Sequence, residues 1–300
     1  MKTAPGVRFV AVAGLIVLAV ATDLGAQTEP LPAQMITVEG RAMRISTAGM
    51  ERRKPGQSVV ILEMGATGPG DALDTWRPVF LEIARLAPVF AYERRGIGRS
   101  EPDTVRPTLR RVGQSLHALL QETRIAPPYV LVGQSWGGVF IRSFSDQYPK
   151  EVVGLVYLDV TDFEATGEKK LTALGPENRK IALEPPVIPE IPPDTPSGLR
   201  AEYEQIKENM LTDFAEARSF RQPAGVPVSV VISARKGGSV VTDALLRLQI
   251  SNQAEWAFTS SNGLLIVSDA VGHIVHRDDP VLVVQAVRHV LEYPPADSAK

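Results

Sequence analysis

The fold is decided by the stretch Tyr129-Val-Leu-Val-Gly-Gln-Ser-Trp-Gly-Gly-Val-Phe-Ile141, in which two apolar runs meet at a short turn rich in glycine. The valine-rich run before Gly133 is typical of a buried strand, and the run after Gly137 has the spacing of a helix. Between them, Ser135 lies in a Gly-X-Ser-X-Gly pattern. Small residues are common in turns, but a serine between a strand and a helix can also be a nucleophile.

Strands and helices alternate on both sides of this stretch. This alternation predicts an α/β fold with a mostly parallel central sheet and helices on both faces. Strands are expected near residues 36–39, 43–46, 58–64, 88–93, 129–133, 152–159, 227–234 and 263–268, and helices near 76–86, 108–124, 199–220, 241–256 and 280–291, with one more ending at 148.

Residues 161–225 interrupt the alternation, because they contain no convincing strand. They hold a proline-rich segment, 184–193, and one charged helix. Long insertions of this kind often form a lid or a binding element, and a surface excursion without a role is the alternative. The predicted organisation is a core of residues 27–160 and 226–300 with a helical lid at 161–225.

Composition excludes several classes of function. The chain has 300 residues, 44% hydrophobic and 22% charged, with a formal net charge of -2 and no cysteine. This is ordinary globular composition, and the lack of a dense basic run argues against nucleic acid as a partner. The absence of cysteine excludes disulfides, thiolate metal sites and a cysteine nucleophile.

Residues 1–26 have the organisation of a secretory signal peptide. Lys2 and Arg8 precede an uncharged apolar run at residues 9–21, which is shorter than the roughly 20 residues that a membrane-spanning helix needs. Cleavage is expected after Ala26, with Ala21 as second choice, and an uncleaved anchor is the alternative. We therefore expect an exported protein, periplasmic or secreted, with no stable membrane anchor after cleavage.

A serine nucleophile needs a histidine base, and the histidine needs an acid to hold its tautomer. The chain has four histidines. His117 and His289 fall in predicted helices and are interpreted as surface or packing residues. His273 and His276 follow the last predicted strand, where a base can reach the carboxyl edge of the sheet.

In these features the chain resembles the α/β-hydrolase-fold serine hydrolases, from about Met35 to the C-terminus. In the family's Gly-His-x-x-His-x-x-x-Pro pattern the first histidine is catalytic, which implies His273 as the base and leaves His276 as the alternative. A metal site of His273, His276 and Asp278 competes with this interpretation, but the resemblance already explains their spacing. No metal or organic cofactor is implied. The matching patterns are Gly133-Gln-Ser-Trp-Gly137, Tyr92-Glu-Arg-Arg-Gly-Ile-Gly-Arg-Ser100, the strand that ends at Asp159, and Gly272-His-Ile-Val-His-Arg-Asp-Asp-Pro280.

The resemblance leaves a choice of acid. Most members carry the acid after the penultimate strand, where this chain has no carboxylate before Asp243. Some relatives place it one strand earlier, at the position of Asp159. The resemblance therefore implies Asp159 first, Asp243 second and Asp162 third. A helix cap or a loop-anchoring carboxylate is the alternative role for Asp159.

Two backbone N–H groups are expected to form the oxyanion hole. One is the N–H of Trp136, at the start of the helix that follows the serine. In the family the other comes from the loop after an earlier strand, usually with the residues His-Gly. This chain has Met64-Gly-Ala66 there. Ala66 is therefore the candidate donor, and the structural hydrogen bond of the missing histidine is lost.

The implied reaction is acyl transfer to water through an acyl-enzyme on Ser135. The resemblance favours a carboxylesterase-like enzyme acting on a small or medium ester as its small-molecule substrate. Amide, lactone, thioester and carbon–carbon bond hydrolysis remain open, as do perhydrolase and aminopeptidase-like activities. A ligand-binding protein without turnover is the alternative from a different class. The serine argues against dehalogenase and epoxide hydrolase chemistry, because those relatives use a carboxylate nucleophile.

Overall fold

The computed structural model describes residues 8–9, 30–66, 72–184, 193, 195, 197–235, 239–260 and 262–293. The predicted signal peptide lies outside these ranges apart from residues 8–9, and so does most of the proline-rich segment. Among the described residues, no helix combines the length and the apolar character needed to cross a membrane.

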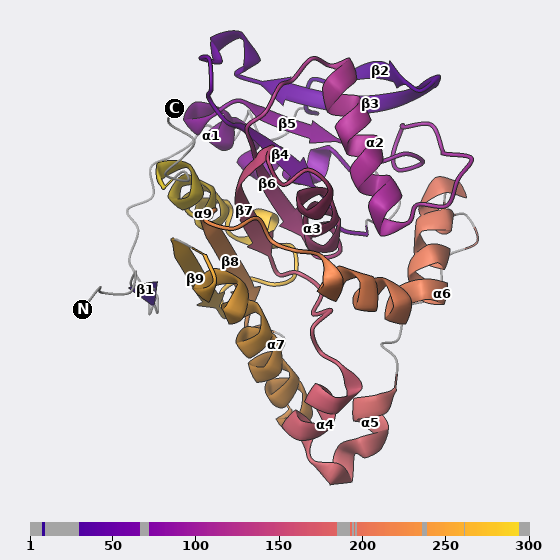
Figure 1. Ribbon diagram of the computed structural model, residues 1–300, viewed down its shortest axis with the longest axis vertical. Helices are drawn as coiled ribbons and strands as arrows, with labels where there is room; N and C mark the ends of the chain where they lie inside the picture. The colour runs from indigo at the N-terminus through magenta and orange to yellow at the C-terminus, as the bar shows by residue number, and fades with distance from the viewer. Residues whose placement is uncertain are drawn as a thin grey trace.

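The described strands form one sheet in the order β1-β9-β8-β7-β6-β4-β5-β3-β2 (Figure 1). In this order, each pair of neighbouring strands up to β4 and β5 is parallel. The last two pairs, β5 with β3 and β3 with β2, are antiparallel. The mostly parallel sheet predicted from the alternation is confirmed. The strands are β1 (Arg8–Phe9), β2 (Gln34–Val38), β3 (Arg41–Ala48), β4 (Val59–Glu63), β5 (Val89–Tyr92), β6 (Tyr129–Gln134), β7 (Val152–Leu158), β8 (Val228–Ser233) and β9 (Gly263–Ser268).

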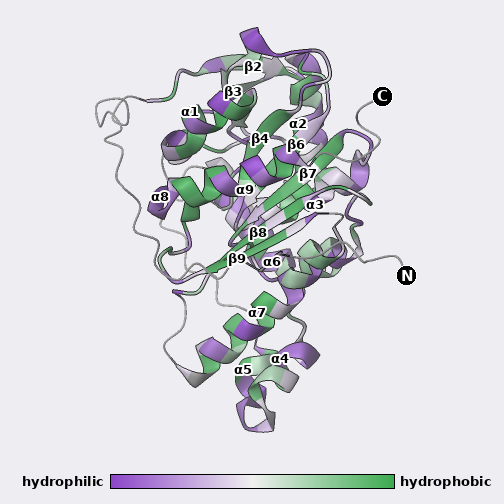
Figure 2. Ribbon diagram, turned by 90° about the vertical axis from the view of Figure 1, so that its left-hand side faces the viewer, coloured by the Kyte–Doolittle hydropathy of each residue, from purple (hydrophilic) through white to green (hydrophobic). Residues whose placement is uncertain are grey.

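Helices cover both faces of the sheet, as Figures 1 and 2 show. Side chains of α2, α3 and α7 join the core on one face, and side chains of α1, α8 and α9 join the core on the other. The helices are η2 (Met50–Arg52), η3 (Asp74–Trp76), α1 (Arg77–Leu86), α2 (Leu109–Glu122), α3 (Gly137–Gln147), α4 (Gly167–Leu174), η4 (Pro176–Asn178), α5 (Arg179–Leu183), α6 (Ser197–Ser219), α7 (Val240–Phe258), α8 (Val275–Asp278) and α9 (Pro280–Glu292).

The central strand β6 shows why the strands read as continuous apolar runs. Tyr129 and Leu131 enter the core under α2 and α3, while Val130 and Val132 enter the core under α1 and α9. Successive side chains of a strand point to opposite faces, so a strand covered on both sides needs apolar residues at every position.

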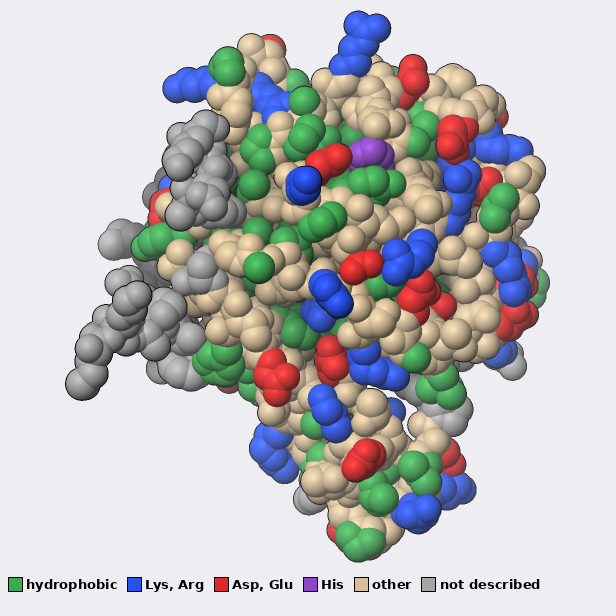
Figure 3. Space-filling view, viewed as in Figure 1, with side chains coloured by type: hydrophobic (Ala, Val, Ile, Leu, Met, Phe, Trp, Pro, Cys, Tyr) green, Lys and Arg blue, Asp and Glu red, His purple; other side chains and the backbone are tan. Residues whose placement is uncertain are grey.

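The inserted segment is helical in its described part. It contains α4, η4, α5 and α6, and α4 and α5 pack on α7 through Leu174, Ala182 and Ala244. These short helices project beyond the sheet (Figure 1), and the projection carries both charged and hydrophobic side chains (Figure 3). The sequence predicted only the long helix of this segment, because α4 and α5 are too short for a clear helical period.

Replacing a buried leucine of β6 tests the core directly. We expect Leu131→Ala to lower the free energy of unfolding by about 2–5 kcal/mol, because it leaves a cavity between the layers. Leu81→Ala on α1 is the matched control: Leu131 is 0% exposed and Leu81 is 50% exposed, so the control should change stability by less than about 0.5 kcal/mol. Urea unfolding measures both, and equal losses would contradict this packing.

Candidate active site

Ser135 lies on the turn between β6 and α3, with a backbone φ of 53°. A non-glycine residue rarely adopts this left-handed region, and holding it there costs on the order of 1–3 kcal/mol. Hydrogen bonds on both sides fix the turn: Ser135 N donates to Leu158 O at 3.0 Å, and Gly138 N donates to Ser135 O at 3.1 Å. The serine is therefore held on a sharp bend at the carboxyl end of the parallel strands.

Close backbone contacts explain the glycines on either side of the serine. A Cβ on Gly133 would lie 2.7 Å from Gly137 O, and a Cβ on Gly137 would lie 2.3 Å from Glu63 O. Neither backbone oxygen can move without displacing a strand or the start of α3. The Gly-X-Ser-X-Gly pattern is thus a packing requirement of this turn as well as a motif.

His273 lies between β9 and α8, with its ring beside the serine. His273 Nε2 is 2.9 Å from Ser135 Oγ. The loop that carries the histidine is tied to the serine turn, because Gln134 Nε2 donates to His273 O at 2.9 Å. A second bond, from Gly272 N to Asp278 Oδ2 at 2.7 Å, closes the loop on α8. These bonds hold the ring over the carboxyl edge of the sheet.

Asp159 follows β7, is fully buried, and places Oδ2 2.6 Å from His273 Nδ1. Its backbone has a φ of 44°, and Ser233 N donates to Oδ1 at 3.1 Å. A carboxylate accepts hydrogen bonds, so this contact assigns the proton to Nδ1. The lone pair of Nε2 is then free to accept the proton of the Ser135 hydroxyl.

The two other candidate acids have different surroundings. Asp243 lies in the first turn of α7. Asp162 accepts two hydrogen bonds from Asn252 Nδ2, at 3.2 and 3.0 Å, and burial raises the pKa of its carboxyl. The structure therefore brings Asp159, and neither Asp243 nor Asp162, against the His273 ring.

The two candidate oxyanion donors belong to two segments that adjoin Ser135. Trp136 is the N-cap of α3, where backbone N–H groups lack partners within the helix. The loop after β4 lies close to the serine, since a Cβ on Gly65 would lie 2.7 Å from Ser135 Cβ. Ala66 is the next residue, so its N–H belongs to the peptide unit that lies against the serine.

His276 is buried in a different environment from His273. Its ring packs on Trp76 with centroids 4.3 Å apart, and neither ring nitrogen has a hydrogen-bond partner among the described residues. Burial lowers the pKa of His276 to about 4, with a further contribution from Arg277. Within the described residues no group of three or more His, Cys, Asp or Glu side chains could hold a metal. His276 is thus a neutral packing residue.

The remaining histidines also lie outside the site. His117 stacks on Tyr148 with centroids 3.8 Å apart, and its Nε2 is 3.1 Å from Glu151 Oε1. His289 belongs to α9, whose side chains pack on the face of the sheet opposite α2, α3 and α7.

Sequence reasoning missed two residues that shape the site. Gln134 holds the histidine loop, and Arg94 donates to the carbonyls of Met64 and Gly65 beside the serine. Gln134 occupies the first X of the Gly-X-Ser-X-Gly pattern, and Arg94 lies within the matching stretch Tyr92–Ser100, but the sequence assigned neither a role. Only the long-range contacts reveal them.

Comparison with known proteins assigns the family. A family model for the alpha/beta hydrolase fold matches residues 58–286, and the chain belongs to this family. The uncharacterized protein YqjL of Bacillus subtilis (strain 168) is 24% identical over 252 residues, which are 80% of this chain and 86% of YqjL.

Solved structures share the fold at low sequence identity. An alpha/beta hydrolase fold protein from Burkholderia ambifaria is 20% identical with a TM-score of 0.58, over 85% of this chain and 96% of that one. The epoxide hydrolase CorEH is 14% identical with a TM-score of 0.55, over 87% of this chain and 98% of that one.

The depressed pKa of His276 predicts a pH-dependent stability. The unfolded chain binds a proton at this side chain below a pH of about 6.5, whereas the folded protein resists protonation down to a pH of about 4. The neutral His276 side chain therefore makes its full contribution to the free energy of unfolding above pH 6.5. This contribution, about 3 kcal/mol in all, is lost as the pH falls to 4. We expect His276→Phe, which keeps a ring on Trp76, to lose less stability over this interval. Urea unfolding from pH 7 to pH 4 measures the difference, and parallel profiles would contradict the prediction.

Proposed function

We propose that the protein is a serine hydrolase in which Ser135, His273 and Asp159 act as nucleophile, base and acid. One observation carries the proposal: Ser135 Oγ, the His273 ring and the Asp159 carboxylate form a continuous chain of hydrogen bonds, 2.9 and 2.6 Å long. This order of groups gives a serine hydroxyl a base of the correct tautomer. Without it, a serine on a strained turn would be a poor nucleophile.

The proposed reaction has two halves. His273 Nε2 takes the hydroxyl proton as Ser135 Oγ attacks the carbonyl carbon, and the N–H groups of Trp136 and Ala66 stabilise the oxyanion. His273 then gives the proton to the leaving group, which departs and leaves an acyl-enzyme on Ser135. Water repeats the steps and releases the acid. By analogy with measured losses elsewhere, each oxyanion donor lowers the barrier by about 3 kcal/mol.

An apolar cavity next to the serine turn supports a carboxylic ester of small or medium size as the substrate. The cavity has a volume of ≈ 350 Å³ and adjoins the turn at Thr161, whose N–H donates to Ser135 O at 3.4 Å. Its wall includes Phe214 of α6, which also packs on Trp136 at 5.4 Å between centroids. An apolar acyl or alcohol group fits such a wall. The other lining residues that are apolar are Ala165, Met210, Leu245 and Leu246.

The insertion at 161–225 supplies most of this wall, which supports its proposed role as a lid and substrate-binding element. Export of the mature protein is proposed on the pattern of residues 1–26 alone. A ligand-binding protein without turnover stays the competing function, and the chemistry of Ser135 separates the two.

Hydrolysis of an activated ester tests the proposal. We expect the wild-type protein to hydrolyse p-nitrophenyl acetate or butyrate, and Ser135→Ala to lower kcat by about 10⁴-fold or more, because it removes the oxygen that forms the acyl-enzyme. Release of p-nitrophenol is followed by absorbance. Turnover that survives in Ser135→Ala would contradict the assignment, and a folded wild-type protein that binds esters without turnover would favour the ligand-binding alternative.

The assignment of the acid has its own test. Asp159→Asn should lower kcat by about 10³–10⁴-fold, because an amide at Oδ2 no longer fixes the proton on His273 Nδ1. Asp243→Asn is the matched control and should leave kcat within about twofold, because it lies apart from the ring. Both variants are compared with the same ester after circular dichroism shows that they are folded. Loss of activity only in Asp243→Asn would contradict the choice of Asp159.

A further inference from the structure

The loop that carries Ala66 is held by the side chain of Arg94. The guanidinium of Arg94 donates from Nη1 to Met64 O at 2.5 Å and from Nη2 to Gly65 O at 2.8 Å. Its side chain also lies over the Phe140 ring, 4.8 Å from the centroid. Arg94 therefore contacts the backbone of the loop directly.

The other N–H groups of Arg94 bind two carboxylates. Nη1 donates to Glu63 Oε1 at 2.6 Å, while Nε and Nη2 donate to Glu202 at 2.8 and 2.6 Å. A guanidinium has five N–H donors, and each of them has an acceptor here. The Arg94 and Glu202 side chains are 5% and 4% exposed. With little of either side chain exposed and all five donors occupied, the guanidinium is held in one orientation.

The bond to Gly65 O determines where the Ala66 N–H points. The Gly65 carbonyl and the Ala66 N–H belong to one planar trans peptide unit, in which C=O and N–H point in opposite directions. Holding the oxygen on the Arg94 side turns the N–H to the opposite side of the unit. The Gly65 position lies against Ser135 Cβ, so the orientation of this peptide decides whether the N–H can serve the oxyanion.

Glu202 connects this anchor to the inserted segment, because it belongs to α6. The start of α6 is seated closely on the loop after β5: a Cβ on Gly198 would lie 2.1 Å from Gly96 O, and Leu199 packs with Ile97. The pair of bonds between Arg94 and Glu202 depends on this seating. Displacement of α6 would leave the guanidinium with unpaired donors in a buried place, which is costly.

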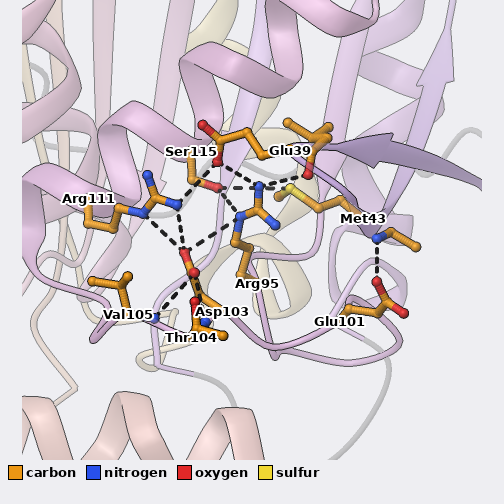
Figure 4. A network of polar contacts seen from close by, with 11 residues as sticks. Glu39, Met43, Arg95, Glu101, Asp103, Thr104, Val105, Arg111 and Ser115 are labelled. Atoms are coloured by element: carbon orange, nitrogen blue, oxygen red, sulfur yellow. Dashed lines mark hydrogen bonds and ion pairs between the residues drawn. The ribbon is translucent and has the colours of Figure 1, made fainter.

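The neighbouring Arg95 has a separate set of partners, which Figure 4 shows. Its Nε donates to Ser115 Oγ at 3.1 Å, and its Nη2 donates to Val38 O at 3.0 Å and to Glu39 Oε2 at 3.1 Å. Asp103 Oδ2 lies 3.7 Å from Nε. These contacts anchor Arg95 to α2 and to the turn between β2 and β3, whereas Arg94 donates to Met64 O and Gly65 O of the oxyanion loop.

We propose that Arg94 is a positioning residue for the oxyanion hole and that Glu202 makes this positioning depend on the docking of α6. The inference rests on the proposed function, because an oxyanion hole has a role only if Ser135 attacks a carbonyl. In the protein with α6 seated, Arg94 presents the Ala66 N–H to the oxyanion. With α6 displaced, the Gly65–Ala66 peptide is free to turn.

The kinetic test compares two carboxylates of the same helix. Glu202→Gln keeps the shape of the side chain but loses one acceptor for the guanidinium, whereas Glu208→Gln alters an exposed ion pair between α6 and Arg106. We expect Glu202→Gln to lower kcat for the activated ester by about tenfold or more with KM within about twofold, and Glu208→Gln to leave both within about twofold. If Arg94→Lys folds, it should also lower kcat with little change in KM. If it does not fold, the result for Glu202→Gln alone tests the proposal.

A measurement independent of turnover reports on the peptide itself. The sequence contains two Gly-Ala pairs, Gly25-Ala26 and Gly65-Ala66. Full-length protein labelled with ¹³C-carbonyl glycine and ¹⁵N-alanine therefore gives two carbonyl–amide cross-peaks, and either Ala26→Ser or cleavage after Ala26 removes one. We expect the cross-peak of Gly65–Ala66 to move in Glu202→Gln and to stay in place in Glu208→Gln.

The outcomes are distinct. An unmoved cross-peak in Glu202→Gln overturns the proposal, even if the variant is less stable, because a merely structural pair would affect stability alone. A moved cross-peak with unchanged kcat overturns the role in oxyanion stabilisation. A wild-type protein without turnover would contradict the proposed function instead, and the cross-peaks would still decide whether Glu202 positions the loop.

Discussion

The hydrogen bond between the buried Asp159 carboxylate and His273 Nδ1 is the interaction on which the rest of the site depends. It joins the end of β7 to the loop after β9, across the end of β8, whose Ser233 N–H binds the other carboxylate oxygen. Burying a charged carboxylate is costly unless it is paired and hydrogen-bonded. Both oxygens of Asp159 have partners, and one of those partners is the ring that faces Ser135. The hydrogen bonds that compensate for burying the Asp159 carboxylate therefore include the one that sets the tautomer of His273.

The parallel sheet makes this convergence available. Strands β4, β6, β7 and β8 all end at the same edge, so the oxyanion loop, the serine turn and the acid follow adjacent strands. Four described non-glycine residues have positive φ values, and two of them, Ser135 and Asp159, lie at this edge. Backbone strain of this kind persists only where the surrounding structure holds it. Here the hydrogen bonds of Ser135 and Asp159 to neighbouring strand ends supply that constraint.

Much of the core could be predicted from the sequence, because the spacing of apolar residues and the residue types of turns depend on neighbouring positions in the chain. The strand at 263–268 was predicted to the residue, and the motifs placed Ser135, Asp159 and His273 at the strand ends where the structure brings them together. The contribution of Arg94 could not be predicted, because its partner Glu202 is 108 positions away and reaches it only through the docking of α6. The helices α4 and α5 escaped prediction for a different reason: their apolar side chains pack on α7, and short helices take their stability from such contacts and not from their own sequence.

Activation of Ser135 is tested most directly by covalent labelling with a fluorophosphonate, followed by mass mapping of the labelled peptide. Such a reagent reports the nucleophile itself and does not require the natural substrate. The hydrogen-bonded chain of Ser135, His273 and Asp159 predicts one adduct, on Ser135, that forms in the wild-type protein and is lost in His273→Ala. A folded wild-type protein that stays unlabelled, or one that labels equally well without His273, would contradict an activated serine at this site.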